Sequence, residues 1–184
     1  MAHNWLQYKL HSELILKLQD VGYTKPTGVQ EQSLFYAHYP VDLIVAAKTG
    51  SGKTMTYVLP ILSNIFQNIE DLEDRLQCLT LVPTRELALQ VFTQFKKMLI
   101  GTAFEKKIRV GLIIGGLSKE KQLRMLKKRP HILISTAGRL WDLIDVDNVK
   151  YLKTLPGIKY LVLDEADRMI ELGQFKEISK VLNF

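Results

Sequence analysis

The sequence has almost no cysteine, no long apolar run and no leader-like N-terminus. Its single cysteine, Cys78, has no partner for an intramolecular disulfide and supplies no zinc cluster, so it is expected as a buried residue of a strand. The longest apolar runs, such as 43–47 and 161–163, fall far short of the roughly 18 residues of a membrane-spanning helix. Residues 1–5 lack the charged and apolar regions of a secretory signal. These absences predict an intracellular protein without membrane association.

The chain has ample apolar material for a folded core. Of its 184 residues, 47% are hydrophobic and 24% are charged, and the mean hydropathy is +0.01. These values exclude a disordered or fibrous chain. No internal repeat, low-complexity tract or long linker interrupts the sequence. Its length therefore predicts a single domain over 1–184.

Positive charge is concentrated in the middle of the chain. The net charge is +6, from 25 basic and 19 acidic residues, yet 101–139 holds ten lysines or arginines against Glu105 and Glu120. Six of the ten lie between Lys119 and Arg129, over about three helical turns. Such a stripe binds phosphates in some proteins, and a solvated helix face explains it equally well.

Short apolar runs alternate with helical patterns. The runs are rich in Val, Ile and Leu with little polar alternation, which is typical of parallel strands buried on both faces. Strands are predicted at 42–47, 79–82, 108–114, 131–135 and 160–163. Helices are predicted at 12–20, 28–38, 53–67, 85–100, 118–128 and 139–144. This order predicts an α/β fold, a doubly wound parallel sheet with helices on both faces, whose ligands bind at the carboxyl ends of the strands.

A phosphate-binding loop follows the first predicted strand. Residues 47–54 match the phosphate-loop pattern, except that Ala47 replaces the leading glycine. Small residues let backbone N–H groups and the following helix N-terminus approach a phosphate, Lys53 adds a cation, and the Thr54 hydroxyl is a ligand for Mg2+. The alternative is a glycine turn that only links strand to helix. The predicted contacts are Ala47, Lys48, Thr49, Gly50, Ser51, Gly52, Lys53 and Thr54.

Acidic residues follow the last predicted strand. The tetrapeptide Asp164-Glu165-Ala166-Asp167 comes directly after 160–163, where a phosphate-loop enzyme holds its Mg2+. Because adjacent residues leave a strand end in different directions, Asp164 is expected to face the metal and Glu165 an attacking water. The alternative is an exposed helix start, where carboxylates are also favoured. Paired with the loop, these residues predict catalytic roles for Lys53, Asp164 and Glu165.

Four further motifs accompany the loop and the acidic residues. They are 22–30 (Gly-Tyr-Thr-Lys-Pro-Thr-Gly-Val-Gln), 83–88 (Pro-Thr-Arg-Glu-Leu-Ala), 115–116 (Gly-Gly) and 136–139 (Thr-Ala-Gly-Arg). In this order, and over nearly the whole chain, the motifs resemble those of the N-terminal RecA-like domain of DEAD-box RNA helicases. Residues 22–30 resemble the family's adenine-recognising Q motif, within a short helical segment over 1–40. Tyr23 and Val29 stand there for the usual Phe and Ile.

The resemblance implies a role for each motif residue. Gln30, whose amide both donates and accepts, is implied to read the adenine edge, and Trp5 either stacks on the base or packs in the core. The implied nucleotide contacts outside the loop are Trp5, Tyr23, Lys25, Gln30, Asp164 and Glu165, with Thr54 and Asp164 on Mg2+. The implied contacts to the RNA backbone, which do not read its sequence, are Pro83, Thr84, Arg85, Gly115, Gly116, Thr136, Gly138 and Arg139. Asp167 is implied to couple the ATP site to a second domain. For the glycines, turn formation is the alternative, and for Arg85 it is a surface charge at a helix start.

Two departures from the family pattern bear on activity. Ala137 replaces a usual proline, which removes no contacting group. The chain ends 17 residues after Asp167, before any Ser-Ala-Thr motif. The resemblance therefore implies a fragment that lacks the second RecA-like domain and its ATP-site arginines, and that is nearly inactive alone.

The expected function is that of an ATP-dependent RNA helicase domain that uses ATP and Mg2+. With the second domain, it would open short RNA duplexes or remodel ribonucleoproteins. A non-catalytic RNA-binding assembly factor with a vestigial ATP fold is the alternative. Another phosphate-loop ATPase, such as a protein translocase or DNA helicase, does not account for Gln30 together with 83–88. Residues 139–144 are similar to the nucleolar subgroup that assembles the large ribosomal subunit, which implies pre-ribosomal partners and a nuclear or nucleolar location.

Overall fold

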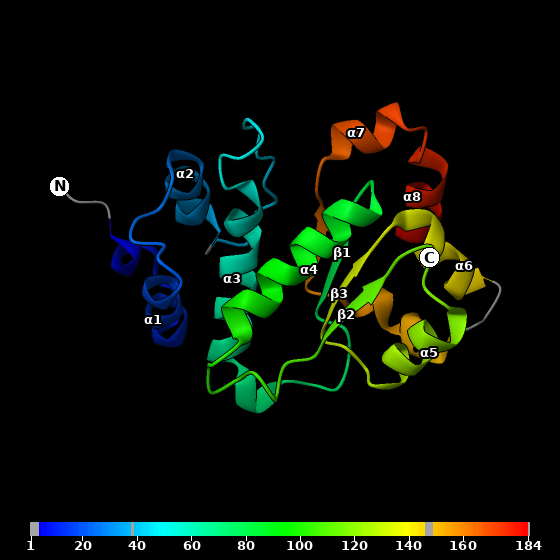
Figure 1. The fold of residues 1–184 in the computed structure, drawn as a ribbon, viewed down its shortest axis with the longest axis horizontal. Helices are drawn as coiled ribbons and strands as arrows, with labels where there is room; N and C mark the ends of the chain where they lie inside the picture. Colours follow the sequence, from blue (N-terminus) through cyan, green and yellow to red (C-terminus); the bar gives the residue numbers. More distant parts are fainter. Residues whose placement is uncertain (1–3, 38, 146–148, 184) are drawn as a thin grey trace. The chain divides into compact units, whose positions relative to one another are not determined.

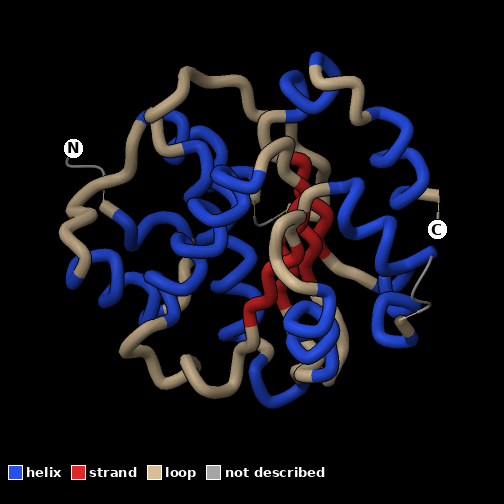
Figure 2. The backbone as a smooth tube through the Cα atoms, turned by 45° about the vertical axis from the view of Figure 1, so that its right-hand side comes forward, coloured by secondary structure: helices blue, strands red, loops and turns tan. Residues whose placement is uncertain are grey.

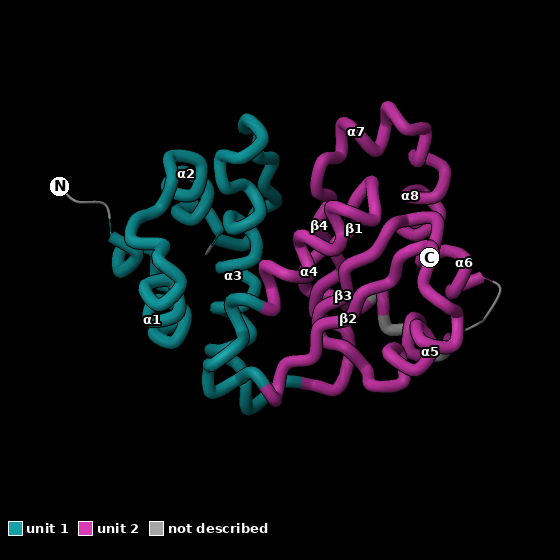
Figure 3. Tube along the Cα trace, viewed as in Figure 1, with its two compact units in different colours: residues 1–72, 97–105 teal, residues 73–96, 106–184 magenta. Residues whose placement is uncertain are grey.

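The computed structural model describes residues 4–37, 39–145 and 149–183, which form two compact units (Figure 3). Unit 1 comprises the described residues of 1–72 and 97–105. Unit 2 comprises those of 73–96 and 106–184. A single domain over 1–184 stays a prediction.

Unit 1 is helical. Its elements are η1 (Trp5–Tyr8), α1 (Ser12–Asp20), α2 (Gly28–Tyr36), α3 (Lys53–Gln67) and η2 (Ile69–Asp71) (Figure 1). α3 buries side chains three and four residues apart, the spacing of one helix face; among them are Met55, Val58, Leu59, Leu62, Ile65 and Phe66. The predicted helices 12–20 and 53–67 are confirmed. The helix predicted at 28–38 ends at Tyr36, and His38 lies outside the described residues.

The strand predicted at 42–47 is wrong, because the structure has no regular secondary structure there. Leu43 and Ile44 of this segment are exposed, Leu43 to 43% and Ile44 completely, and none of its residues is buried. A strand needs a neighbour that pairs with its backbone N–H and C=O groups. The described part of unit 1 contains no strand that serves this purpose. An apolar run of the right length is therefore not sufficient to form a strand.

Unit 2 contains a four-stranded parallel sheet, red in Figure 2. Its strands β1 (Cys78–Leu81), β2 (Val110–Ile113), β3 (Ile132–Ser135) and β4 (Tyr160–Leu163) lie in the order β2-β3-β1-β4. Each of the four overlaps a predicted strand. The last residue of β1 pairs with the last residues of β3 and β4, and those of β2 and β3 pair likewise. The four carboxyl ends therefore meet at one edge of the sheet.

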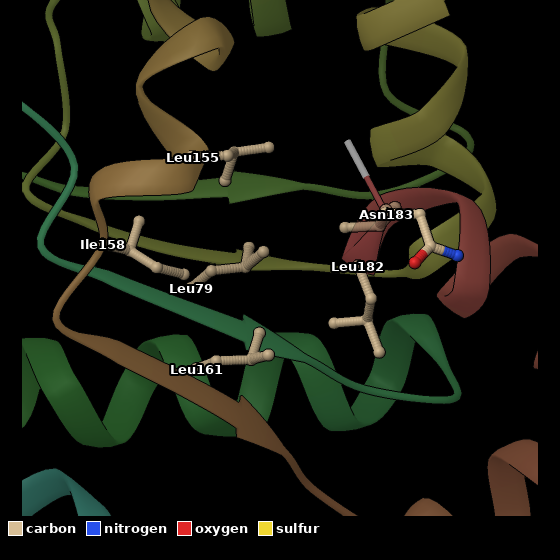
Figure 4. A pocket seen from close by; sticks show the side chains of 7 residues that line it. Leu79, Leu155, Ile158, Leu161, Leu182 and Asn183 are labelled. Atoms are coloured by element: carbon tan, nitrogen blue, oxygen red, sulfur yellow. The ribbon is translucent and has the colours of Figure 1, made fainter.

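Helices cover both faces of this sheet, as predicted. α4 (Arg85–Leu99) lies along one face, and α5 (Lys119–Lys127), α6 (Ala137–Asp145) and α8 (Phe175–Leu182) lie on the other (Figures 1 and 4). Leu79 and Leu81 of β1 join a core cluster with Leu140 of α6 and Ile178 of α8. The elements not predicted are the three 3-10 helices, including η3 (Lys150–Gly157), together with α7 (Ala166–Glu171) and α8. Within the described residues, no helix combines the length and apolar composition needed to cross a membrane.

A buried histidine lies at the amino-terminal end of the sheet. His131 directly precedes β3 and is 2% exposed. The backbone N–H of Arg109 donates to its Nδ1 at 3.2 Å, and the Arg109 guanidinium lies 3.0 Å from its Nε2. Burial and the charge of Arg109 lower the pKa of His131 to about 4, although the carboxylate of Asp74 opposes them.

We expect the free energy of unfolding to fall as the pH drops from 6.5 towards 4, because of His131. Its pKa is 6.5 without the fold and about 4 within it, so the fold favours the neutral imidazole. The stabilisation is complete above pH 6.5 and is lost as protonation proceeds, up to about 3 kcal/mol. Urea unfolding near pH 7 and near pH 4.5 measures the loss. His131→Asn should show a smaller pH dependence, and an identical one would contradict this role.

Candidate functional site

The phosphate loop forms a tight turn at the start of α3. Gly50 and Gly52 have φ angles of +78° and +93°, which residues with side chains rarely adopt. The ammonium of Lys53, the first residue of α3, donates to the carbonyl of Ala47 at 2.5 Å. The hydroxyl of Ser51 is buried and has no hydrogen-bond partner among the described residues. A partnerless buried hydroxyl beside a lysine and a helix N-terminus fits a phosphate ligand.

The Q motif contacts the phosphate loop, and both lie in unit 1. The Nε2 of Gln30 donates to the carbonyl of Gly52 at 3.0 Å, and the Thr27 hydroxyl donates to that of Ser51 at 2.8 Å. The Oε1 of Gln30 also accepts the N–H of Thr27 at 2.9 Å, in a capping box that begins α2. A Cβ at position 52 would lie 2.5 Å from the Gln30 Nε2, so this contact requires glycine. These bonds leave one N–H and one lone pair of the Gln30 amide for a base.

The two aromatic residues of the predicted base site form contacts with other residues of unit 1. Trp5 is 2% exposed, and its Nε1 donates to the carbonyl of Tyr23 at 2.6 Å. This burial favours packing over stacking for Trp5. The ammonium of Lys97 lies 4.5 Å from the centre of the Tyr23 ring and donates to its hydroxyl at 3.2 Å. Lys25, the other predicted contact, is exposed.

The acidic residues occupy the carboxyl end of β4, in unit 2. Asp164 is 9% exposed, and its N–H donates to the carbonyl of Leu81 at the end of β1. Glu165 precedes α7 in the left-handed conformation, with φ of +53°, and its carboxylate lies 3.5 Å from the guanidinium of Arg168. Asp167 is exposed, and its carboxylate accepts the N–H of Arg168. Glu165 thus departs from the strand in a left-handed conformation, whereas Asp164 does not have a positive φ; the roles of both residues stay predictions.

Two of the predicted RNA motifs touch each other at the strand ends. Thr84 accepts the N–H of Leu87 at 3.2 Å and so caps α4. The guanidinium of Arg85 lies against Gly115 and Gly116, where a Cβ would stand 2.6 Å and 2.5 Å from its nitrogen atoms. Both positions therefore need glycine for this close approach. Residues 83–85 and 115–116 form one surface that carries a cation.

The third RNA motif, 136–139, leads from β3 into α6. The N–H of Thr136 donates to the carbonyl of Ile113 at 3.3 Å, which places the motif beside the end of β2. Ala137 is buried and is the first residue of α6. Proline is well tolerated at that position of a helix, so alanine there changes little. Gly138 and Arg139 are partly exposed.

Two glutamines, Gln122 and the partly exposed Gln174, bond to the RNA motifs, although no motif had pointed to them. Gln122 of α5 is 1% exposed; its Nε2 donates to the carbonyl of Leu117 at 2.9 Å, and its Oε1 accepts from the Nε of Arg139 at 3.4 Å. The Nε2 of Gln174 donates to the carbonyl of Pro83 at 3.0 Å. For Gln122 the only sequence signal is its position one turn before an apolar residue of α5.

The predicted residues therefore form two groups. The phosphate loop and the Q motif belong to unit 1, whereas the acidic residues and the RNA motifs belong to unit 2. The predicted Mg2+ ligands, Thr54 and Asp164, belong to different units, and their joint role stays a prediction. Among the residues that the structure describes, no three His, Cys, Asp or Glu side chains are grouped to hold a metal ion.

An apolar pocket lies on the sheet face of unit 2, away from these motifs (Figure 4). Its volume is about 220 Å3, and none of the predicted site residues lines it. The lining residues are Leu79, Leu155, Ile158, Leu161, Val181, Leu182 and Asn183. Without a charged side chain, this pocket does not suit a nucleotide phosphate.

A phosphate loop with an associated Q motif, and acidic residues at the end of a parallel strand, define a nucleotide-binding protein of the RecA-like class. The family model for DEAD/DEAH box helicases matches residues 27–184. The chain belongs to this family, and the predicted family is confirmed.

Similar proteins carry the same designation. A DEAD-box ATP-dependent RNA helicase 13 from Oryza sativa subsp. japonica is 40% identical over 98% of this chain, and an ATP-dependent rRNA helicase RRP3 from Yarrowia lipolytica is 37% identical over 89%. The structure of the DEAD-box helicase Mss116 bound to ssRNA and UDP-BeF superposes with a TM-score of 0.84, at 29% identity, over 96% of this chain. The predicted α/β fold is thereby confirmed. The chain spans 23% and 32% of the two relatives and 35% of the chain in that structure.

Proposed function

We propose that this chain is the ATP-binding and RNA-binding first domain of an ATP-dependent RNA helicase. The observation that carries the proposal is the bond from Gln30 to the carbonyl of Gly52, because it joins a base-reading amide to the phosphate loop within one unit. The names of the relatives, which are ATP-dependent RNA or rRNA helicases, support it. A solved relative bound to both RNA and a nucleotide supports it as well.

Each residue of the proposed ATP site has a task. The N–H groups of the loop and the ammonium of Lys53 bind the phosphates, which requires Lys53 to exchange its bond to Ala47 for the ligand. The Thr54 hydroxyl of unit 1 and Asp164 of unit 2 would hold Mg2+, which would supply charge neutralisation when bound. Glu165 accepts the proton of the attacking water.

The proposed RNA site binds the phosphate backbone. Arg85 supplies the cation, and Gly115 and Gly116 allow a close approach at the same surface. Arg139, held by Gln122, supplies a second cation. Such contacts fix the position of the RNA strand and do not read its sequence.

The second domain, coupled through Asp167, would supply the arginines that complete ATP hydrolysis and the other half of the RNA groove. For this reason the present chain alone is expected to be nearly inactive.

The cellular role belongs to the same proposal. The Yarrowia lipolytica relative is called an rRNA helicase, and residues 139–144 resemble the nucleolar subgroup. We therefore propose that the protein remodels pre-ribosomal particles in the nucleus or nucleolus.

Nucleotide selectivity tests the proposed ATP site. We expect the chain to bind ADP about tenfold more tightly than GDP, because Gln30 pairs with adenine and leaves guanine mismatched. Fluorescence titration with labelled ADP and GDP measures both dissociation constants. One solved relative is described with a uridine nucleotide, so the preference has to be measured on this chain.

The matched control is Gln32→Ala, which alters an exposed glutamine of the same helix. Gln30→Ala should bring the ratio of the two dissociation constants close to one, whereas Gln32→Ala should leave it unchanged. Equal affinity of the unmodified chain for ADP and GDP, or a ratio that survives Gln30→Ala, would show that Gln30 does not select the base.

A further inference from the structure

The exposed side of α5 carries an unpaired basic stripe, defined here as Lys121, Arg124 and Lys128. The three side chains are exposed; Lys121 and Arg124 lie on α5, and Lys128, in a helical backbone conformation, caps its carboxyl end. Their spacing of three and four residues places them on one side of the helix, about 10 Å apart from first to last. The opposite side of α5 is buried through Gln122 and Leu126. The stripe is therefore presented to solvent by a helix whose orientation on unit 2 is fixed.

The charged groups of the stripe have no ion-pair partner among the described residues. The Arg124 Nε donates only to the backbone carbonyl of Glu120, at 3.3 Å. Lysine and arginine charges gathered in this way attract a polyanion, and RNA phosphates are such a ligand.

The position of α5 connects the stripe to the RNA motifs. Ser118 caps the helix by accepting the N–H of Lys121 at 3.4 Å, and it stands two residues after Gly116. On the buried side, Gln122 bonds to the carbonyl of Leu117 and to Arg139. α5 also packs against β2, one of the two edge strands of the described sheet (Figure 1). The stripe thus begins in the first turn of α5, five residues after Gly116.

We propose that the stripe binds the phosphates of RNA nucleotides next to those that the motif loops hold, and so lengthens the RNA path along α5. This inference rests on the proposed function, because it takes RNA as the ligand of residues 83–85, 115–116 and 136–139. The charge of the stripe suits any polyanion, and its continuity with those loops favours RNA over an acidic protein surface. An RNA that reaches the stripe has to be longer than one that fills only the motif loops. Binding to the stripe can therefore be separated from binding to the loops by the length of the RNA.

The test compares short and long single-stranded RNA on the 184-residue chain and on the triple variant Lys121→Gln, Arg124→Gln, Lys128→Gln. With an oligonucleotide of about six nucleotides, which fills only the motif loops, the two proteins should bind equally. With about twenty nucleotides, the variant should bind about tenfold more weakly at low salt. Its slope of log K against log salt should be shallower by about 2, because each lost phosphate contact to a single strand contributes about 0.7.

The matched control changes the same amount of charge elsewhere on unit 2. Lys106, Lys153 and Lys159 are exposed and lie before β2, within η3 and before β4. Their triple change to Gln should preserve the preference for long RNA, and circular dichroism should show both variants folded.

The outcomes separate this inference from the proposed function. If the unmodified chain binds neither RNA, the proposed function fails. If it binds both and the stripe variant still matches it on long RNA, the stripe has no RNA role and α5 is merely a solvated face or binds another partner. An equal loss in the control variant, or an equal loss on short RNA, would also overturn the proposed extension.

Discussion

Replacing Glu165 by glutamine in the longer helicase, of which we propose this chain is a part, is expected to abolish ATP hydrolysis while ATP binding remains. Glu165 follows β4 in a left-handed conformation and is partly exposed, so its carboxylate is available to an attacking water. The amide has nearly the same shape and accepts no proton. The loss in kcat should be about 100-fold to 10,000-fold, the usual contribution of a general base.

An RNA-stimulated phosphate-release assay measures the effect, with labelled ATP to monitor binding. Glu171→Gln is the control, because Glu171 is an exposed carboxylate at the far end of α7, the helix that Glu165 precedes. Full ATPase activity in the Glu165→Gln protein would refute the assignment of the base. An unmodified long protein that binds RNA but hydrolyses no ATP would favour the alternative of a non-catalytic assembly factor.

Periodicity and composition sufficed for an element such as α3, which is held by contacts close in the sequence, and also for β4, although Leu161 and Leu163 of that strand are exposed to 44% and 39%. α3 begins and ends where its apolar face and its glycine-rich start predict, and β4 coincides with the predicted 160–163. The segment 42–47 has the same composition as a buried strand, yet Ile44 is completely exposed. A strand depends on a partner distant in the sequence, and composition does not encode whether that partner pairs with it.

The candidate site shows the same limit at the level of single side chains. The motifs identified Arg85, Gly115 and Gly116, but the close approach of the guanidinium to both glycines depends on strands that end in step. Gln122 carries no motif, because its importance comes from bonds to Leu117 and Arg139 across the fold. A residue such as Gln122, which positions another side chain by a hydrogen bond across the fold, is therefore identified only from the three-dimensional structure.

Removing the positive charge of Lys53 should have the largest effect on nucleotide binding. In Lys53→Ala we expect the dissociation constant for ADP to rise about 10-fold to 100-fold, because a hydrogen bond to a charged group contributes about 1.5–3 kcal/mol. Lys9→Ala, which alters an exposed lysine of the same unit outside the predicted site, is the control and should change the dissociation constant little. Titration with labelled ADP measures both.

The same variant decides whether Lys53 serves the ligand or the fold. Without ligand its ammonium donates only to a carbonyl of its own loop, that of Ala47, as far as the described residues show. Losing one such partly exposed bond should lower the free energy of unfolding by less than about 0.5 kcal/mol, as for an ordinary surface change. Urea unfolding of the ligand-free protein tests this expectation. A markedly larger loss would mean that the bond to Ala47 holds the loop together, and weak ADP binding would then report a distorted loop instead of a missing phosphate contact.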